Sequence, residues 1–122
     1  MKSCLVVDDS KVVRMVARRV LQDLAFEVRE AANGQEAMVS CLSRMPDVVL
    51  LDWNMPVMNG IDFLRALRAV PGGDAPVVVF CTTENDITHI RQAIDLGANE
   101  YIMKPFDSEI IELKFAQVGV LG

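Results

Sequence analysis

The chain has 122 residues, of which 52% are apolar, and this length accommodates one domain around a single hydrophobic core. Asp and Glu (17) outnumber Lys and Arg (12), and the formal net charge of −5 argues against direct binding to nucleic-acid phosphates. The apolar runs, such as residues 48–51, are far shorter than a membrane span, and the first run leads into two aspartates rather than a secretory cleavage site. We therefore expect a cytoplasmic protein without membrane insertion and without a nucleic-acid partner.

The cysteines and the single histidine do not form a metal-ligand pattern. Cys4, Cys41 and Cys81 are widely spaced, and no Cys-x-x-Cys pair occurs, so a zinc site built from Cys and His lacks ligands. We expect three reduced thiols that act as small apolar groups in the core. His89 falls on an expected helix, away from the predicted site, and we assign it no chemistry.

Short apolar runs alternate with amphipathic stretches along the chain, which is typical of a parallel sheet covered by helices. The expected strands are residues 4–7, 27–31, 48–51, 77–81 and 100–103. The first, third and fourth are continuous and rich in Val and Leu, as in strands buried on both faces.

Five helices are expected from the 3.6-residue period and from turn residues. They are residues 11–24, the stretch from Asn33-Gly34 to about 43, the stretch from Asn59-Gly60 to just before Pro71, about 85–96, and the stretch from near Ser108. The apolar stripe of the first helix is Val13, Val16, Ala17, Val20, Leu21 and Leu24. In the fourth helix the residues expected to face inward are Ile87, Ile90, Ala93 and Ile94. Five such β-α units predict an α/β fold with one doubly wound, parallel, five-stranded sheet.

Polar residues stand at the ends of four expected strands. Asp8 and Asp9 follow the first strand, Asp52 the third, Thr82 the fourth and Lys104 the fifth. Ligands of open α/β sheets bind beyond the carboxyl ends of the strands, so we expect these groups to meet at one edge.

Three carboxylates at close range repel one another, so either some stay protonated or a cation is bound, and their hard oxygen atoms suit Mg²⁺. An aspartate at such a site can accept a phosphoryl group as an acyl phosphate. Single aspartates at strand ends are often only turn formers or helix caps, but four groups on one edge favour a functional site.

Four segments carry a family resemblance. They are Leu5-Val6-Val7-Asp8-Asp9-Ser10, Leu51-Asp52-Trp53-Asn54-Met55-Pro56, Thr82-Thr83-Glu84 and Tyr101-Ile102-Met103-Lys104-Pro105-Phe106. Together they resemble the receiver domain of two-component response regulators, and within that family the stand-alone chemotaxis regulators. The resemblance covers essentially the whole chain and implies a flavodoxin-like (βα)5 fold with strand order 2-1-3-4-5. It also implies one receiver domain over residues 1–122 with no output domain.

The resemblance implies a role for each residue of the site. Asp52 would be the phosphoacceptor, and Lys104 would contact the phosphoryl group and precede a cis peptide bond to Pro105. The cofactor would be Mg²⁺, held by Asp8, Asp9, Asp52 and the backbone carbonyl of Asn54. Thr82 and Tyr101 would form the switch, in which the hydroxyl moves toward the phosphoryl group and the ring turns inward. Asn54 and Glu84 would tune the lifetime of the phosphoryl group.

Other positions carry weaker signals. Thr83 stands where a small residue is commoner in the family. Asn59 stands where Asp is commoner, and a role as a helix cap explains it equally well. Arg14, Arg18 and Arg19 on the first helix are expected to form a solvated basic face, with docking of a kinase as the alternative.

The implied function is a signalling switch that catalyses its own phosphorylation and dephosphorylation. Its partners would be a histidine kinase or histidine phosphotransfer protein and a downstream target such as a flagellar motor switch component. The alternative is a phosphorelay intermediate or phosphate sink without a downstream effector. A dedicated hydrolase with an aspartyl-phosphate intermediate and a flavodoxin-like cofactor-binding protein both fit less well. The hydrolase needs a second Asp two positions after a nucleophile that follows the first strand, but here Asp8-Asp9 is followed by Ser10-Lys11. The cofactor-binding protein needs a Gly-rich phosphate loop after the first strand, where this chain has two carboxylates.

Overall fold

Five strands and five helices alternate along the chain in the computed structural model, which describes residues 1–83 and 87–121. The strands are β1 (Ser3–Val7), β2 (Glu27–Ala31), β3 (Val48–Asp52), β4 (Val77–Thr82) and β5 (Glu100–Met103). The helices are α1 (Lys11–Asp23), α2 (Gly34–Ser43), α3 (Gly60–Ala69), α4 (Ile87–Asp95) and α5 (Ser108–Gln117). Every pair of neighbouring strands is parallel, and the order is β2-β1-β3-β4-β5, which confirms the predicted fold.

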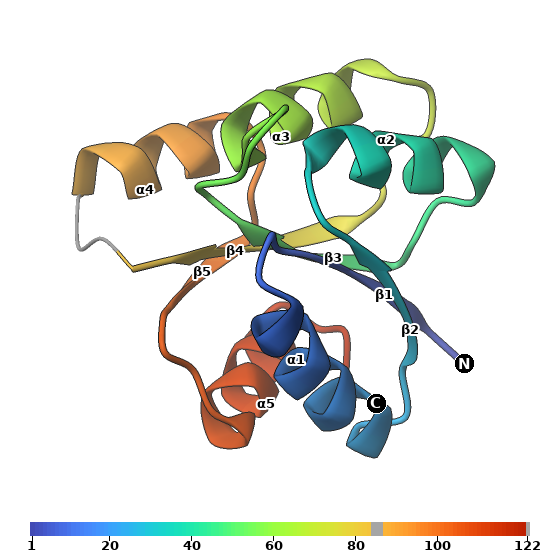
Figure 1. Cartoon of the computed structure of the whole chain (residues 1–122), viewed down its shortest axis with the longest axis vertical. Helices are drawn as coiled ribbons and strands as arrows, with labels where there is room; N and C mark the ends of the chain where they lie inside the picture. Colours follow the sequence, from blue (N-terminus) through green and yellow to red (C-terminus); the bar gives the residue numbers. More distant parts are fainter. Residues whose placement is uncertain (84–86, 122) are drawn as a thin grey trace.

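The sheet lies between two layers of helices. Helices α2, α3 and α4 cover one face, and α1 and α5 cover the other (Figure 1). The chain moves outward from β1 to β2 in one direction and from β3 to β5 in the other, so the strand order reverses beside β1 and β3. This reversal is where doubly wound sheets bind ligands. No helix in the described part of the chain is long and apolar enough to cross a membrane.

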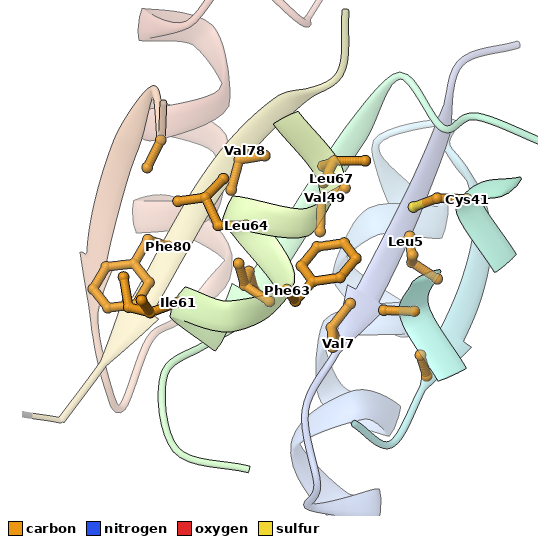
Figure 2. Packing of buried hydrophobic residues seen from close by; sticks show 14 of the residues in the cluster. Leu5, Val7, Cys41, Val49, Ile61, Phe63, Leu64, Leu67, Val78 and Phe80 are labelled. Atoms are coloured by element: carbon orange, nitrogen blue, oxygen red, sulfur yellow. The ribbon is translucent and has the colours of Figure 1, made fainter. Parts of the chain in front are cut away.

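The core has two halves because side chains of a strand alternate between its two faces. Leu5 and Val7 of β1 point into the half under α2 and α3, whereas Cys4 and Val6 point into the half under α1 and α5. Figure 2 shows the first half, in which Phe63 and other side chains of α3 pack on β1, β3 and β4. The three cysteines are free and buried, and burial raises the pKa of the Cys4 thiol to about 12, which confirms their role as core groups.

Polar side chains cap the start of four of the helices. Ser10, Asn33, Asn59 and Asp107 each accept a hydrogen bond from a backbone N–H in the first turn of the following helix. Asn59 accepts from the Asp62 N–H at 2.9 Å, so the residue at this position is a helix cap.

The apolar stripes do not all face the sheet. Ile87 and Ile94 on α4 are 72% and 43% exposed, so the prediction that they face inward is wrong. Val16, in the apolar stripe of α1, is 46% exposed. Ile87 and Ile94 are seven residues apart and project from the same side of α4, turned away from Ala93, which is the buried residue of that helix. An apolar stripe can be wider than the strip of helix that the sheet covers, and periodicity does not reveal which part is covered. The predicted start of this helix, Asn85, lies outside the described residues.

Arg68 joins two loops at the end of the sheet opposite to the carboxyl ends of the strands. Its guanidinium donates to the carbonyl oxygens of Gly73 and Pro76 at 2.8 Å each, and to that of Gly97 at 2.6 Å. These bonds satisfy loop carbonyls that no strand or helix partner would otherwise satisfy. The loop before β4 and the loop after α4 are therefore held by one side chain of α3.

Candidate functional site

Three carboxylates gather at the carboxyl ends of β1 and β3. Asp8 and Asp9 directly follow β1, Asp52 is the last residue of β3, and one oxygen from each lies within 4.8 Å of the others. Asp8 and Asp52 are only 3% and 7% exposed, whereas Asp9 is exposed to solvent. The structure thus brings together the three acidic residues that the sequence predicts at this edge.

Lys104, which directly follows β5, reaches into this acidic cluster. Its Nζ lies 2.5 Å from Asp8 Oδ2 and 3.0 Å from Asp52 Oδ1. Its backbone N–H donates to the carbonyl of Thr82 at 2.8 Å, and the Lys104–Pro105 peptide bond is cis, as the resemblance implies. The backbone of Lys104 is therefore anchored to the end of β4, and its side chain spans both buried carboxylates.

The electrostatics of the cluster favour an added cation. Burial raises the pKa of Asp52, the charges of Asp8 and Asp9 raise it further, and the hydrogen bond and charge of Lys104 oppose this without cancelling it. The pKa of Lys104 is raised, because its hydrogen bonds and ion pairs with the two carboxylates outweigh the effect of burial. Among the described residues, one ammonium faces three carboxylates, and the cluster offers hard oxygen ligands, which is the donor set that Mg²⁺ prefers.

The loop after β3 is held tightly beneath the acidic cluster. The Trp53 N–H donates to the Cys81 carbonyl at 3.1 Å, and the Gly60 N–H donates to the Trp53 carbonyl at 3.0 Å. A Cβ at Gly60 would overlap the backbone carbonyl of Asp52, so this close approach requires glycine. The loop also contains a γ-turn at Val57, whose φ is +70°. Glycine at the start of α3 thus allows the loop to fold back against Asp52.

The two residues of the predicted switch lie on adjacent elements. Thr82 is buried at the end of β4, and Tyr101 is half-buried on β5, opposite Phe80. The Lys114 ammonium lies 4.9 Å from the centre of the Tyr101 ring, and it pairs with Glu100 at 3.4 Å. The ring borders a groove of about 350 Å³ between β5 and α5.

The remaining predicted positions are less constrained. Asn54 is exposed in the loop after β3, and Thr83 is exposed after β4. Thr83 lines an apolar groove of about 370 Å³ beside Lys104, together with valines of α1. Glu84, predicted to tune the rate, lies outside the described residues.

Two features of the site are missed by the sequence analysis. The His89 ring stacks on the Trp53 ring, with centres 4.7 Å apart and planes 26° apart, so His89 contacts the residue that follows Asp52. Trp53 also packs edge-on against Phe80 at 4.9 Å. Arg14 and Arg18 of the predicted basic face on α1 both pair with a glutamate of β2, and the prediction of a solvated side chain is wrong for Arg14, which is only 16% exposed. Neither feature has a signal in residue spacing, since each joins segments distant in the sequence.

A doubly wound α/β domain with an acidic cluster and a lysine at the carboxyl ends of its strands defines the class of this protein. The model of the response regulator receiver domain matches residues 4–115, and the chain belongs to this family. It is 36% identical to the chemotaxis protein CheY of Pseudomonas aeruginosa over 115 residues, which cover 93% of each chain. It is also 36% identical to CheY1 of Helicobacter pylori over 116 residues, which cover 93% of this chain and 94% of that protein.

A solved structure supports the same assignment. The chemotaxis response regulator CheY4 of Vibrio cholerae superposes with a TM-score of 0.91 at 33% identity, covering 97% of this chain and 98% of that chain. The fold and the family predicted from the sequence are both confirmed.

Proposed function

We propose that this protein is a phosphorylation-controlled switch of a cytoplasmic two-component pathway, with Asp52 as its phosphoacceptor. The observation that carries the proposal is the setting of Asp52, a buried carboxylate held at 3.0 Å from the Lys104 ammonium and within 4.8 Å of two further carboxylates. Membership of the receiver family supports a histidine kinase or histidine phosphotransfer protein as the donor.

In the proposed reaction, a carboxylate oxygen of Asp52 attacks the phosphorus of a donor phosphohistidine. The new bond is the oxygen–phosphorus bond of an acyl phosphate, the phosphorus–nitrogen bond breaks, and the imidazole leaves with the electron pair. Lys104 supplies a fixed positive charge beside the attacked phosphoryl group. Dephosphorylation is the attack of water on the same phosphorus, and Asn54 and Glu84 are proposed to tune its rate.

Asp8, Asp9 and Asp52, with the backbone carbonyl of Asn54, would hold Mg²⁺. The fit is supported by the carboxylate oxygens within 4.8 Å of one another and by the excess of carboxylates over ammonium groups. When bound there, Mg²⁺ supplies positive charge that neutralises and orients the phosphoryl oxygens. Asp8 and Asp52 are buried and anchored, and Asp9 adds a ligand from the solvent side.

The output is proposed to be a change in affinity for another protein. The Thr82 hydroxyl would donate to a phosphoryl oxygen on Asp52, and the space it leaves would admit the Tyr101 ring from the neighbouring strand. Because Tyr101 borders the groove between β5 and α5, its movement would alter a surface that a partner can bind. The matched CheY relatives favour a chemotaxis target such as a flagellar motor switch component.

Fluorescence of Trp53, the only tryptophan and the neighbour of Asp52, tests the proposal. We expect one change of emission on adding Mg²⁺ and a second on adding beryllofluoride or acetyl phosphate. Asp52→Asn should lose the second change, and the matched control Glu112→Gln, an exposed carboxylate on α5, should keep both. A second change that persists in Asp52→Asn would overturn the assignment of the acceptor.

The switch is tested separately from the chemistry. Thr82→Ala should still incorporate phosphate from acetyl phosphate, measured by mass spectrometry, but should lose the phosphorylation-dependent change in binding to the partner. If the wild-type protein is phosphorylated, binds no partner differently, and returns phosphate rapidly to a phosphotransfer protein, the phosphorelay or phosphate-sink function holds instead.

A further inference from the structure

The peptide unit between Asp8 and Asp9 is fixed by an arginine of α1. The Asp8 N–H donates to the Ala31 carbonyl of β2 at 3.1 Å, and Asp8 Oδ1 accepts from the Ser10 N–H at 2.8 Å. The Asp8 carbonyl oxygen accepts from Arg14 Nη1 at 2.7 Å. Because the peptide unit is planar, fixing this carbonyl also fixes the direction in which the chain enters Asp9.

Arg14 is itself held in place from a neighbouring strand. Its Nε lies 3.0 Å from Glu30 Oε1, and Arg18 Nε lies 2.7 Å from Glu30 Oε2. The Arg14 side chain is only 16% exposed. The hydrogen bonds and charges of the two arginines hold the pKa of Glu30 below its usual range, although partial burial opposes them. The planar guanidinium therefore bridges β2 and the loop after β1 through two different nitrogens, Nε and Nη1, a fixed spacing that the single nitrogen of a lysine does not provide.

Asp9 is the member of the acidic cluster that depends most on this backbone. Asp8 and Asp52 are buried and both contact Lys104, whereas the Asp9 side chain is exposed and makes no hydrogen bond or ion pair within residues 1–83 and 87–121. The position of its carboxylate therefore depends on the backbone that carries it and on its own rotamer, and not on contacts of the carboxylate.

We propose that Arg14 is a positioning residue of the metal site. By fixing the Asp8–Asp9 peptide unit, it holds the Asp9 carboxylate in the cluster and thereby raises the affinity for Mg²⁺. The inference rests on the Mg²⁺ site of the proposed function. It opposes the expectation from charge alone, in which a guanidinium near a cation site weakens cation binding by repulsion.

The test is a Mg²⁺ titration followed by Trp53 fluorescence, with no phosphodonor present. Loss of a group that orients a metal ligand typically costs about 10- to 100-fold in metal affinity, and we expect Arg14→Ala to weaken Mg²⁺ binding about tenfold. Arg14→Lys keeps the positive charge but loses the planar guanidinium, so this variant should also bind Mg²⁺ more weakly than the wild type does. The matched control Arg18→Ala removes the other cation from Glu30 without touching Asp8, and its Mg²⁺ affinity should stay within about twofold.

Urea unfolding in chelator separates affinity from stability. Arg14→Ala and Arg18→Ala should both lose some stability, since each loses an ion pair with Glu30, but only the Arg14 variants should lose Mg²⁺ affinity. If Arg14→Ala does not fold, Arg14→Lys alone decides. Wild-type affinity in Arg14→Lys, or equal or tighter binding in Arg14→Ala, would overturn the inference. A wild-type protein that gives no response to Mg²⁺ would overturn the metal site of the proposed function itself.

Discussion

Replacing Asp52 with asparagine removes one of three crowded carboxylates while keeping its size and its oxygen acceptor. At an effective dielectric constant of about 20, carboxylate oxygens 4.8 Å apart or less repel by at least about 3.5 kcal/mol, and an ammonium at 3.0 Å attracts by about 5.5 kcal/mol. The repulsions of Asp8 and Asp9 together thus offset the attraction of Lys104. The loss of hydration on burial therefore determines that the charged Asp52 side chain lowers the free energy of unfolding. Lys104 keeps Asp8 as its partner in the variant. In the presence of a chelator we expect Asp52→Asn to be more stable than the wild type by about 1–2 kcal/mol at neutral pH.

The difference in stability between Asp52→Asn and the wild type depends on pH. The pKa of Asp52 is raised above its ordinary value of 3.8, chiefly by burial, so the folded protein holds this proton more tightly than the unfolded chain does. The stability that this protonation supplies is present in full below 3.8 and is lost as pH rises through the folded-state pKa. The advantage of Asp52→Asn should therefore be present at neutral pH and should disappear as pH falls toward 3.8.

Urea unfolding followed by far-ultraviolet circular dichroism measures these differences. The control is Glu112→Gln, which removes an exposed carboxylate from α5 and should change the free energy of unfolding by less than about 0.5 kcal/mol. Saturating Mg²⁺ should stabilise the wild type more than Asp52→Asn, because a ligand that binds only the folded state adds to its stability. If Asp52→Asn in chelator is less stable than the wild type by more than about 1 kcal/mol, the ion pair with Lys104 outweighs burial and repulsion, and the expected stabilisation is refuted.

Three further substitutions test how the fold supports the site. Gly60→Ala should cost about 3 kcal/mol or more in urea unfolding and should weaken the Trp53 response to Mg²⁺, because the new Cβ would overlap the Asp52 carbonyl. Arg68→Met should cost about 2–4 kcal/mol by leaving loop carbonyls unsatisfied, while the folded variant should bind Mg²⁺ as the wild type does; altered affinity would contradict this separation. Val57→Gly should raise the free energy of unfolding by up to about 1 kcal/mol, because a β-branched residue is strained at φ +70°; an unchanged or lower value would show that the γ-turn carries no such strain.

Periodicity was sufficient to predict the sheet and its helices, because buried strands and amphipathic helices leave different repeats in the sequence. The predicted strands 48–51 and 77–81 are each one residue short, since Asp52 and Thr82 are polar residues that the sheet nevertheless includes. Periodicity did not predict which part of the α4 stripe is buried. Ala93 is buried as predicted, but Ile87 and Ile94, which fit the same apolar stripe, are exposed.

The sequence by itself determined the fold class and the convergence of Asp8, Asp9, Asp52 and Lys104, because parallel strands place the residues that follow them at one edge. Only the tertiary structure decided that Lys104 bridges two of the carboxylates, that Asp9 alone is exposed and that His89 stacks on Trp53. It also showed that Arg14 reaches the Asp8 carbonyl. These contacts depend on the rotation of each helix and on the rotamer of each long side chain, and both are set by packing against segments distant in the sequence.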